Sequence, residues 1–191
     1  MAKQRQLDIL ADEIVAKRVC EDLALQATQL VMGSGSPNAD IVLIGEAPGK
    51  NEDLQGKPFV GAAGKFLDVL LNAAGMDRGD VYITNIVKYR PPNNRDPTSQ
   101  EKKEFWPFLL RQLAIINPKV VITLGRHSGG YFIPDLIIGN DHGIPKTVKS
   151  SQYEFLVIPL YHPAAALYNG TMRQVLIDDF IKAAQFAKRQ K

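Results

Sequence analysis

The feature that most constrains the fold of this chain is the alternation of short apolar runs, rich in β-branched residues, with longer segments of helical spacing. Short runs bounded by glycine or turn residues are typical of buried strands. Strands that alternate with helices are joined by parallel crossovers, and the helices then cover both faces of the sheet. The pattern therefore predicts an α/β fold, a three-layer α/β/α sandwich around a central four-stranded parallel sheet. The four expected strands are Ile41–Ile44, Val81–Thr84, Val120–Leu124 and Glu154–Leu160.

Four other segments have apolar residues at helical spacing. Thr98 or Ser99 is suited to cap the third of them, with Glu101 or Glu104 nearby. A cluster of turn residues at 33–38 separates the first helical segment from the first strand. The expected helical segments are Leu7–Leu30, which fits one or two helices, Gly61–Gly75, Ser99–Ile116 and Thr171–Gln190.

The bulk properties describe an ordinary globular chain. Its 191 residues fit one domain, 1–191, with an N-terminal helical segment at about 5–30. The net charge of +3 permits nucleic-acid binding without arguing for it, and the single cysteine excludes an internal disulfide. No apolar run reaches the length of a membrane span, and the charged start lacks the pattern of a signal peptide. We therefore expect a cytoplasmic protein without a membrane partner, and we expect a monomer.

Most of the unusual residues follow the ends of the expected strands. In sheets of this kind, ligands bind outside the carboxyl ends of the strands. This coincidence places a functional site at that edge from the residues alone. The segments concerned are Gly45–Asp53, Asn85–Arg95, Gly125–Gly130 and Tyr161–Asn169.

The first of these segments contains three carboxylates, Glu46, Glu52 and Asp53. It is not a phosphate-binding loop, because the spacing from Gly45 to Lys50 is too short and no serine or threonine follows the lysine. Carboxylates at a strand end favour a functional role for Glu46 and Glu52. Asp53 fits the solvated start of a helix better.

Three further residues have side chains suited to a flat, polar ligand. Asn85 ends the second strand, and its amide can read the edge of a base or, equally, cap the turn. Phe59 lies in a loop, and its ring could pack into the hydrophobic core or stack on such a ligand. His162 leaves a strand toward the same edge, which favours function over a structural role. No paired histidine motif supports a metal here, so we expect none.

A basic loop follows Asn85 and contains Lys88, Arg90 and Arg95 between prolines and asparagines. A stiff basic loop beside a pocket can hold the phosphates of a nucleic acid. The alternative is a charged, solvated loop, and this segment taken alone favours that alternative.

Together these segments resemble the uracil-DNA glycosylase superfamily, and most closely its iron–sulfur branch, often called family four. The resemblance runs from about residue 17 to the closing helix. Each motif alone is weak, but their order and spacing are highly specific. The motifs are Gly45–Asp53, Lys57–Gly61, Ile83–Lys88, Arg90–Arg95, and His162–Pro163 followed by small residues.

The resemblance implies a role for each candidate residue. Asn85 would bind the pairing edge of a uracil flipped out of DNA, and Phe59 would stack on its ring. Glu52 would help to position the attacking water, and His162 would stabilise negative charge at uracil O2. The resemblance also implies that Glu46 is a catalytic group. The implied pocket residues are Gly45, Glu46, Ala47, Pro48 and Gly49. The implied DNA contacts are Lys88, Arg90, Arg95, Pro163 and Ala164.

The iron–sulfur branch binds its cluster with four cysteines, and the matching positions here are Lys17, Cys20, Tyr89 and Phe105. One thiol is too few for a [4Fe–4S] cluster, so we expect no cofactor. The two aromatic residues are expected to pack where the cluster would lie. Cys20 is expected to be partly buried and inert.

These observations support one interpretation and leave alternatives. The interpretation is a metal-independent DNA-repair glycosylase that removes uracil from DNA and leaves an abasic site. One alternative is a DNA-binding relative without catalysis, and another is action on a different deaminated base such as hypoxanthine or xanthine. A hydrolase that uses Ser128 and His162 is less favoured, because the residues around Ser128 lack the nucleophile-elbow pattern.

Overall fold

In the computed structural model, which describes residues 1–150 and 153–190, six strands form one sheet. Their order across the sheet is β1-β3-β2-β4-β6-β5. The strands are β1 (Ser34–Gly35), β2 (Ile41–Gly45), β3 (Tyr82–Asn85), β4 (Val120–Leu124), β5 (Lys146–Lys149) and β6 (Glu154–Leu160).

The four inner strands, β3, β2, β4 and β6, run parallel to one another. All residues of β2, β3 and β4 are buried, as expected for strands covered on both faces. The predicted parallel sheet is therefore confirmed as the centre of a larger sheet. β3 begins and ends one residue later than predicted, so Asn85 is its last residue and pairs with Gly45 of β2.

The two edge strands, β1 and β5, are absent from the sequence-based prediction. They pair antiparallel with β3 and β6. β1 has only two residues and lies within the segment predicted as a turn. β5 alternates between half-buried and exposed residues and has a lysine at each end, a composition that protects a sheet edge from pairing with other chains.

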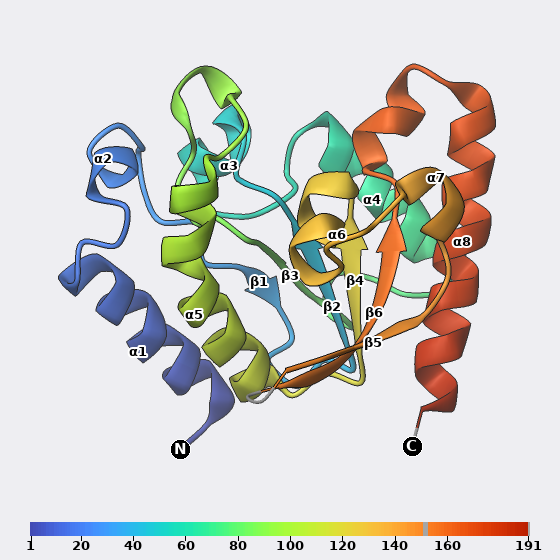
Figure 1. Ribbon diagram of the computed structural model, residues 1–191, viewed down its shortest axis with the longest axis horizontal. Helices are drawn as coiled ribbons and strands as arrows, with labels where there is room; N and C mark the ends of the chain where they lie inside the picture. Colours follow the sequence, from blue (N-terminus) through green and yellow to red (C-terminus); the bar gives the residue numbers. More distant parts are fainter. Residues whose placement is uncertain (151–152, 191) are drawn as a thin grey trace.

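Helices cover both faces of the sheet (Figure 1). α1 (Lys3–Ala16) and α5 (Ser99–Ile116) pack on one face, and α4 (Ala62–Ala73) and α8 (Gly170–Arg189) pack on the other. Each face therefore has its own apolar core, and the predicted three-layer sandwich is confirmed.

Local signals explain where two of these helices begin and end. Thr98 caps α5 in a capping box with Glu101, in which each side chain accepts a hydrogen bond from the backbone of the other residue. The first helical segment divides into α1 and α2 (Glu21–Ala24), because Arg18 and Cys20 between them have left-handed backbone conformations.

Several short helices lie around the carboxyl ends of the strands, mostly in the upper half of the molecule in Figure 1. The functional candidates lie in or beside these short helices. Within the described residues, no helix combines the length and apolar character needed to cross a lipid bilayer. The short helices are α3 (Lys50–Gln55), η1 (Pro92–Asn94), α6 (Arg126–Phe132), α7 (Ile138–Asp141) and η2 (Pro163–Leu167).

Candidate active site

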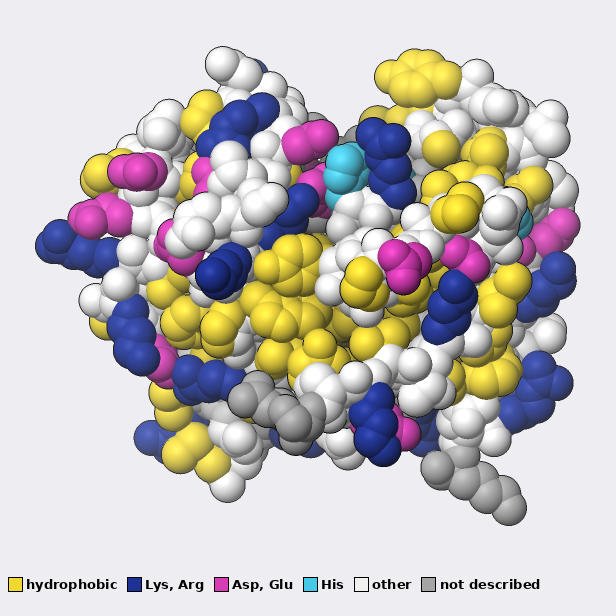
Figure 2. Space-filling view, in the orientation of Figure 1, with side chains coloured by type: hydrophobic (Ala, Val, Ile, Leu, Met, Phe, Trp, Pro, Cys, Tyr) yellow, Lys and Arg dark blue, Asp and Glu magenta, His cyan; other side chains and the backbone are white. Residues whose placement is uncertain are grey.

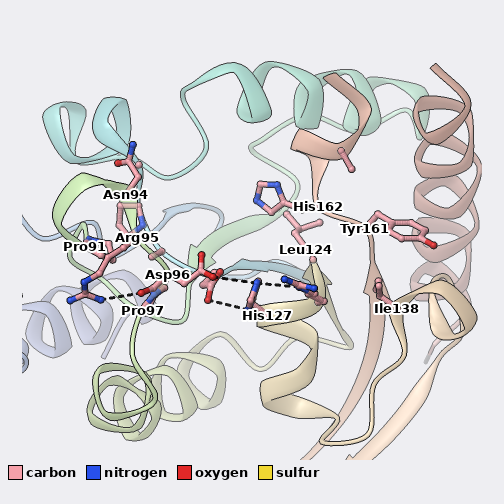
Figure 3. Close-up of a pocket in the computed structure, with 17 residues that line it drawn as sticks. Pro91, Asn94, Arg95, Asp96, Pro97, Leu124, His127, Ile138, Tyr161 and His162 are labelled. Carbon is pink, nitrogen blue, oxygen red and sulfur yellow. Dashed lines mark hydrogen bonds and ion pairs between the residues drawn. The ribbon is translucent and has the colours of Figure 1, made fainter. Parts of the chain in front are cut away.

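A cavity of about 440 Å³ opens at the carboxyl edge of the sheet. Figure 2 shows a hollow at the upper edge of the molecule, with histidine, acidic and basic side chains around it. In Figure 3, Arg95 and Asp96 approach this cavity from the side opposite His162 and Tyr161. The lining consists of residues 46–49, 94–97 and 124–127 together with Pro91, Ile138, Tyr161, His162 and Ala165.

Asn85 and Phe59 lie beyond this lining, next to Gly45. A Cβ atom on Gly45 would lie 2.4 Å from Asn85 Oδ1 and 2.7 Å from Phe59 Cζ. Glycine is therefore required at position 45 for the two side chains to meet there. Asn85 is 2% exposed, and within the described residues no protein group hydrogen-bonds its side chain. An enclosed amide without a protein partner can still hydrogen-bond a ligand.

The loop around Phe59 is tied to α3 by Glu52. The Oε1 atom of Glu52 accepts hydrogen bonds from the backbone N–H groups of Val60 and Gly61, each at 2.8 Å. Phe59 itself has a φ of +53°, a conformation that costs free energy in a bulky residue. The carboxylate of Glu52 therefore stabilises a strained turn that presents the aromatic ring.

Arg78 holds the same turn from the other side. Its guanidinium donates hydrogen bonds to the carbonyl oxygens of Phe59, at 2.5 Å, and Pro58, at 3.2 Å. A Cβ atom on Gly64 would lie 1.7 Å from the carbonyl oxygen of Phe59, so only glycine lets the helix approach this closely. The aromatic ring is thus positioned by backbone contacts on both sides.

His162 is positioned by the turn that follows β6. Its Nδ1 atom accepts a hydrogen bond from the backbone N–H of Ala164 at 3.1 Å, so the neutral ring carries its proton on Nε2. Burial, with a smaller contribution from the charge of His127, lowers the pKa of His162 and favours this neutral form. The ring centroid lies 5.9 Å from that of Phe59.

A polar cluster in the cavity was not recognised from the sequence. Glu46 Oε1 lies 3.4 Å from Lys102 Nζ and 3.6 Å from His127 Nδ1, and His127 Nε2 lies 3.7 Å from Asp96 Oδ2. Burial raises the pKa of Glu46, while the charges of His127 and Lys102 oppose that rise. The residues of the cluster come from four separate segments, so no local sequence motif identifies it. The sequence did indicate that His127 follows a strand that ends before Gly125.

The same cluster contains the residues best placed to hold a metal ion. One ligand atom each from Glu46, Asp96 and His127 lies within 4.8 Å of the others. The ammonium of Lys102 already lies beside the Glu46 carboxylate and competes with any cation for it. The expectation of no metal stays a prediction.

Lys88 requires a correction. The sequence predicted a phosphate contact in a basic loop, but the side chain of Lys88 is fully buried. It turns inward because three oxygen atoms beneath the loop accept hydrogen bonds from its Nζ atom. Lys88 therefore lies outside any DNA-contacting surface.

Three of the other four predicted DNA contacts are exposed or half-buried, and the fourth, Pro163, is buried. Arg95 is exposed, lines the cavity, and forms two hydrogen bonds with Glu101. Arg90 is half-buried and donates to Asn94 Oδ1 at 2.7 Å. Pro163 is buried and Ala164 is half-buried in η2.

One other sequence-based interpretation, that of Asp53, is wrong, and the disfavoured serine hydrolase loses its remaining basis. Asp53 is buried rather than solvated, because its carboxylate accepts hydrogen bonds from the backbone and hydroxyl groups of Thr28. Ser128 is fully buried, and its hydroxyl donates to the carbonyl oxygen of Gly125. The side chain of Ser128 lies outside the groups that line the cavity near His162, which removes the basis for a serine hydrolase.

The positions matched to cluster cysteines do not fit an iron–sulfur cluster. A [4Fe–4S] cluster requires four ligands, and Cys20 is the one cysteine in the sequence. The rings of Tyr89 and Phe105 contact each other, with centroids 5.9 Å apart, in the same apolar core as Cys20. Burial and the nearby Glu104 raise the pKa of the Cys20 thiol, which keeps it protonated.

Comparison with known proteins agrees with this geometry. The family model of the uracil DNA glycosylase superfamily matches residues 32–185. The chain therefore belongs to the uracil-DNA glycosylase superfamily.

Several relatives that the chain matches over most of its length are type-4 enzymes. The chain is 48% identical to the type-4 uracil-DNA glycosylase of Saccharolobus solfataricus, over 94% of this chain and 85% of that protein. It is 42% identical to the type-4 enzyme of Archaeoglobus fulgidus, over 96% and 94% of the two chains. It is 39% identical to the type-4 enzyme of Thermotoga maritima, over the whole of both chains.

Proposed function

We propose that this protein is a DNA-repair glycosylase that hydrolyses the N-glycosidic bond of deoxyuridine in DNA and leaves an abasic site. The observation that carries the proposal is the enclosed amide of Asn85 beside the ring of Phe59. The amide offers one donor and one acceptor to the pairing edge of uracil, and the ring offers a stacking surface. A site built to satisfy such an edge discriminates strongly against bases that lack it.

The cleavage step depends on stabilising charge that appears as the bond breaks. The sugar becomes oxocarbenium-like, and the electron pair of the breaking bond leaves with the base as an anion. The Nε2–H of neutral His162 is a donor suited to that anion, because the Nδ1 contact with Ala164 fixes the tautomer. Water then adds to the sugar carbon, and the base takes up a proton.

Two carboxylates were expected to act in catalysis, and they occupy different places. Glu46 lines the cavity, whereas Glu52 lies outside its lining and accepts hydrogen bonds from the Phe59 loop. These contacts favour a role for Glu52 in holding Phe59. A role in positioning the attacking water stays a prediction, and the conservative variant Glu52→Gln separates the two.

The segment after His162 has the properties of a DNA-facing element. At its end, Leu167 is 40% exposed and Tyr168 is 92% exposed. Apolar and aromatic side chains at such a tip can press between bases and hold open the space left by a flipped nucleotide. Arg95 and Arg126, at the cavity, are suited to contact the phosphates.

The test is base release from a labelled oligonucleotide with one deoxyuridine, placed opposite guanine, opposite adenine or unpaired. Alkali-labile breaks at that position are expected with the unmodified protein and not with Asn85→Ala. Matched oligonucleotides with hypoxanthine or xanthine test the other deaminated bases. Tight binding of uracil-containing DNA without release of any base would instead identify a non-catalytic DNA-binding relative.

A further inference from the structure

Lys88 is a buried lysine to which the proposed mechanism assigns no role. It is fully buried, and its Nζ atom donates to Thr84 Oγ1 at 2.6 Å, to Asn85 O at 2.7 Å and to Gln112 Oε1 at 2.7 Å. Within the described residues, none of the ion pairs includes this ammonium. Burying a lysine without a carboxylate partner is costly, so its retention needs a physical reason.

The surrounding hydrogen bonds form a closed network between β3 and α5. The side-chain amide of Gln112 donates to the carbonyl oxygen of Met32 and to Tyr82 Oη, and the hydroxyl of Thr84 donates to the same carbonyl. Three acceptors match the three hydrogens of an ammonium, whereas a neutral amine has two. Burial lowers the pKa of Lys88. The three oxygen atoms around Nζ are the acceptors that the protonated side chain requires.

The network reaches the active site through one atom, the carbonyl oxygen of Asn85. Asn85 is the last residue of β3, and its carbonyl oxygen accepts a hydrogen bond from Lys88 Nζ. A charge-assisted hydrogen bond is stronger than a neutral one and holds its acceptor in a defined direction. A fixed carbonyl restricts the backbone conformation at Asn85. The direction of the Cα–Cβ bond is then fixed too, and this bond carries the side-chain amide.

We propose that Lys88 is a positioning residue that orients the Asn85 amide for uracil through the backbone carbonyl of Asn85. The inference rests on the proposed function, because it assigns to Asn85 the reading of the base. It predicts that loss of Lys88 weakens recognition of the base and leaves the contacts with the DNA backbone intact. A purely structural role would instead lower stability and reduce both kinds of binding together.

The experiment compares Lys88→Met with Tyr82→Phe in the full chain. Tyr82→Phe removes one hydrogen bond of the same network and leaves the three contacts of Lys88 in place. The readouts are the thermal midpoint, the constant for inhibition by free uracil, kcat and KM on deoxyuridine DNA, and affinity for DNA with an abasic-site analogue. Lys88→Met is expected to weaken uracil inhibition about tenfold, as loss of one buried hydrogen-bonding contact would, with abasic-DNA affinity unchanged.

A double-mutant cycle makes the result decisive. The cycle is read as affinity for DNA that carries a non-hydrolysable deoxyuridine analogue, because Asn85→Ala is expected to lack activity. If Lys88 acts through Asn85, the loss of this affinity caused by Lys88→Met disappears in the Asn85→Ala background. The proposal is overturned if Lys88→Met causes the same loss of affinity in the Asn85→Ala background. It is also overturned if Lys88→Met and Tyr82→Phe weaken uracil inhibition equally.

A second variant covers the case in which Lys88→Met does not fold. Gln112→Glu places a carboxylate beside the ammonium and draws it away from the Asn85 carbonyl, so the same selective weakening of uracil inhibition is expected. Unchanged uracil inhibition in that variant counts against the proposal. If the unmodified protein neither cleaves deoxyuridine DNA nor is inhibited by uracil, the proposed function itself fails, which is a distinct outcome.

Discussion

The two walls of the active site are held in different ways. On the β3 side, Asn85 and Phe59 are almost fully buried, and the backbone carbonyl of each accepts a hydrogen bond from a side chain, that of Lys88 at Asn85 and that of Arg78 at Phe59. On the β6 side, the hydrogen bonds that residues 162–168 form among the described residues are local, between His162 and the two alanines that follow Pro163. That segment ends at the exposed Tyr168.

The difference fits the roles proposed for the two walls. A donor and an acceptor that read a base must be fixed within a fraction of an ångström, and buried supporting contacts provide that. A segment that presses into DNA meets a partner whose shape changes as the nucleotide leaves the stack, so local support is sufficient. The comparison leads to predictions for variants on each wall.

The largest effect on kcat is expected for a substitution on the β6 side, at His162. His162→Ala should lower kcat by about 10²- to 10³-fold, because it removes the donor that we propose stabilises the leaving base. His142→Ala is a matched control, since His142 pairs with Asp179 outside the cavity lining. Single-turnover base release measures both, and a small loss in His162→Ala would place the main charge stabilisation on the β3 wall.

The next effect tests how the β3 wall is supported. Glu52→Ala leaves the N–H groups of Val60 and Gly61 without their acceptor and should lower kcat/KM by about 10- to 100-fold. Glu52→Gln keeps an acceptor oxygen and should retain most of the activity. Steady-state kinetics on deoxyuridine DNA separate the two roles: equal losses in both variants would mean that the negative charge of Glu52 acts on the water.

Acid pH should affect the β6 wall through His162. Protonation puts a hydrogen on Nδ1 opposite the N–H of Ala164, so kcat should fall by up to about tenfold per pH unit below the lowered pKa of His162. Because the folded pKa lies below the ordinary value of 6.5, the folded state also loses stability as pH falls from 6.5 through that pKa, and the loss then levels off. Rate–pH profiles and thermal melts check both, and a His162→Ala profile with the same acid limb would assign that limb to another group.

The smallest effect is expected at the tip of the segment. Tyr168→Ala should raise KM for duplex substrate by about tenfold or less and change KM for single-stranded substrate little, since only the duplex has a stack to be held open. Tyr168→Phe, which keeps the ring, should behave like the unmodified protein. Equal losses on both substrates would show that Tyr168 contributes general affinity rather than support for the flipped nucleotide.

The fold was largely predictable because the inner strands are continuous apolar runs and the main helices have regular spacing. The edge strands were not, because β1 is too short and β5 too polar to produce a pattern. Among site residues, Asn85 and His162 could be found from their positions after strands. Lys88 could not be placed, because its burial depends on Gln112, which lies on α5 far along the chain.

The buried thiol of Cys20 has a practical consequence. With its pKa raised and its side chain 7% exposed, it reacts slowly with thiol reagents. A Tyr168→Cys variant would therefore carry one readily labelled thiol at a site where the native side chain is 92% exposed. A fluorescent or spin label attached there would report, in real time, the moment at which the tip of the segment enters DNA.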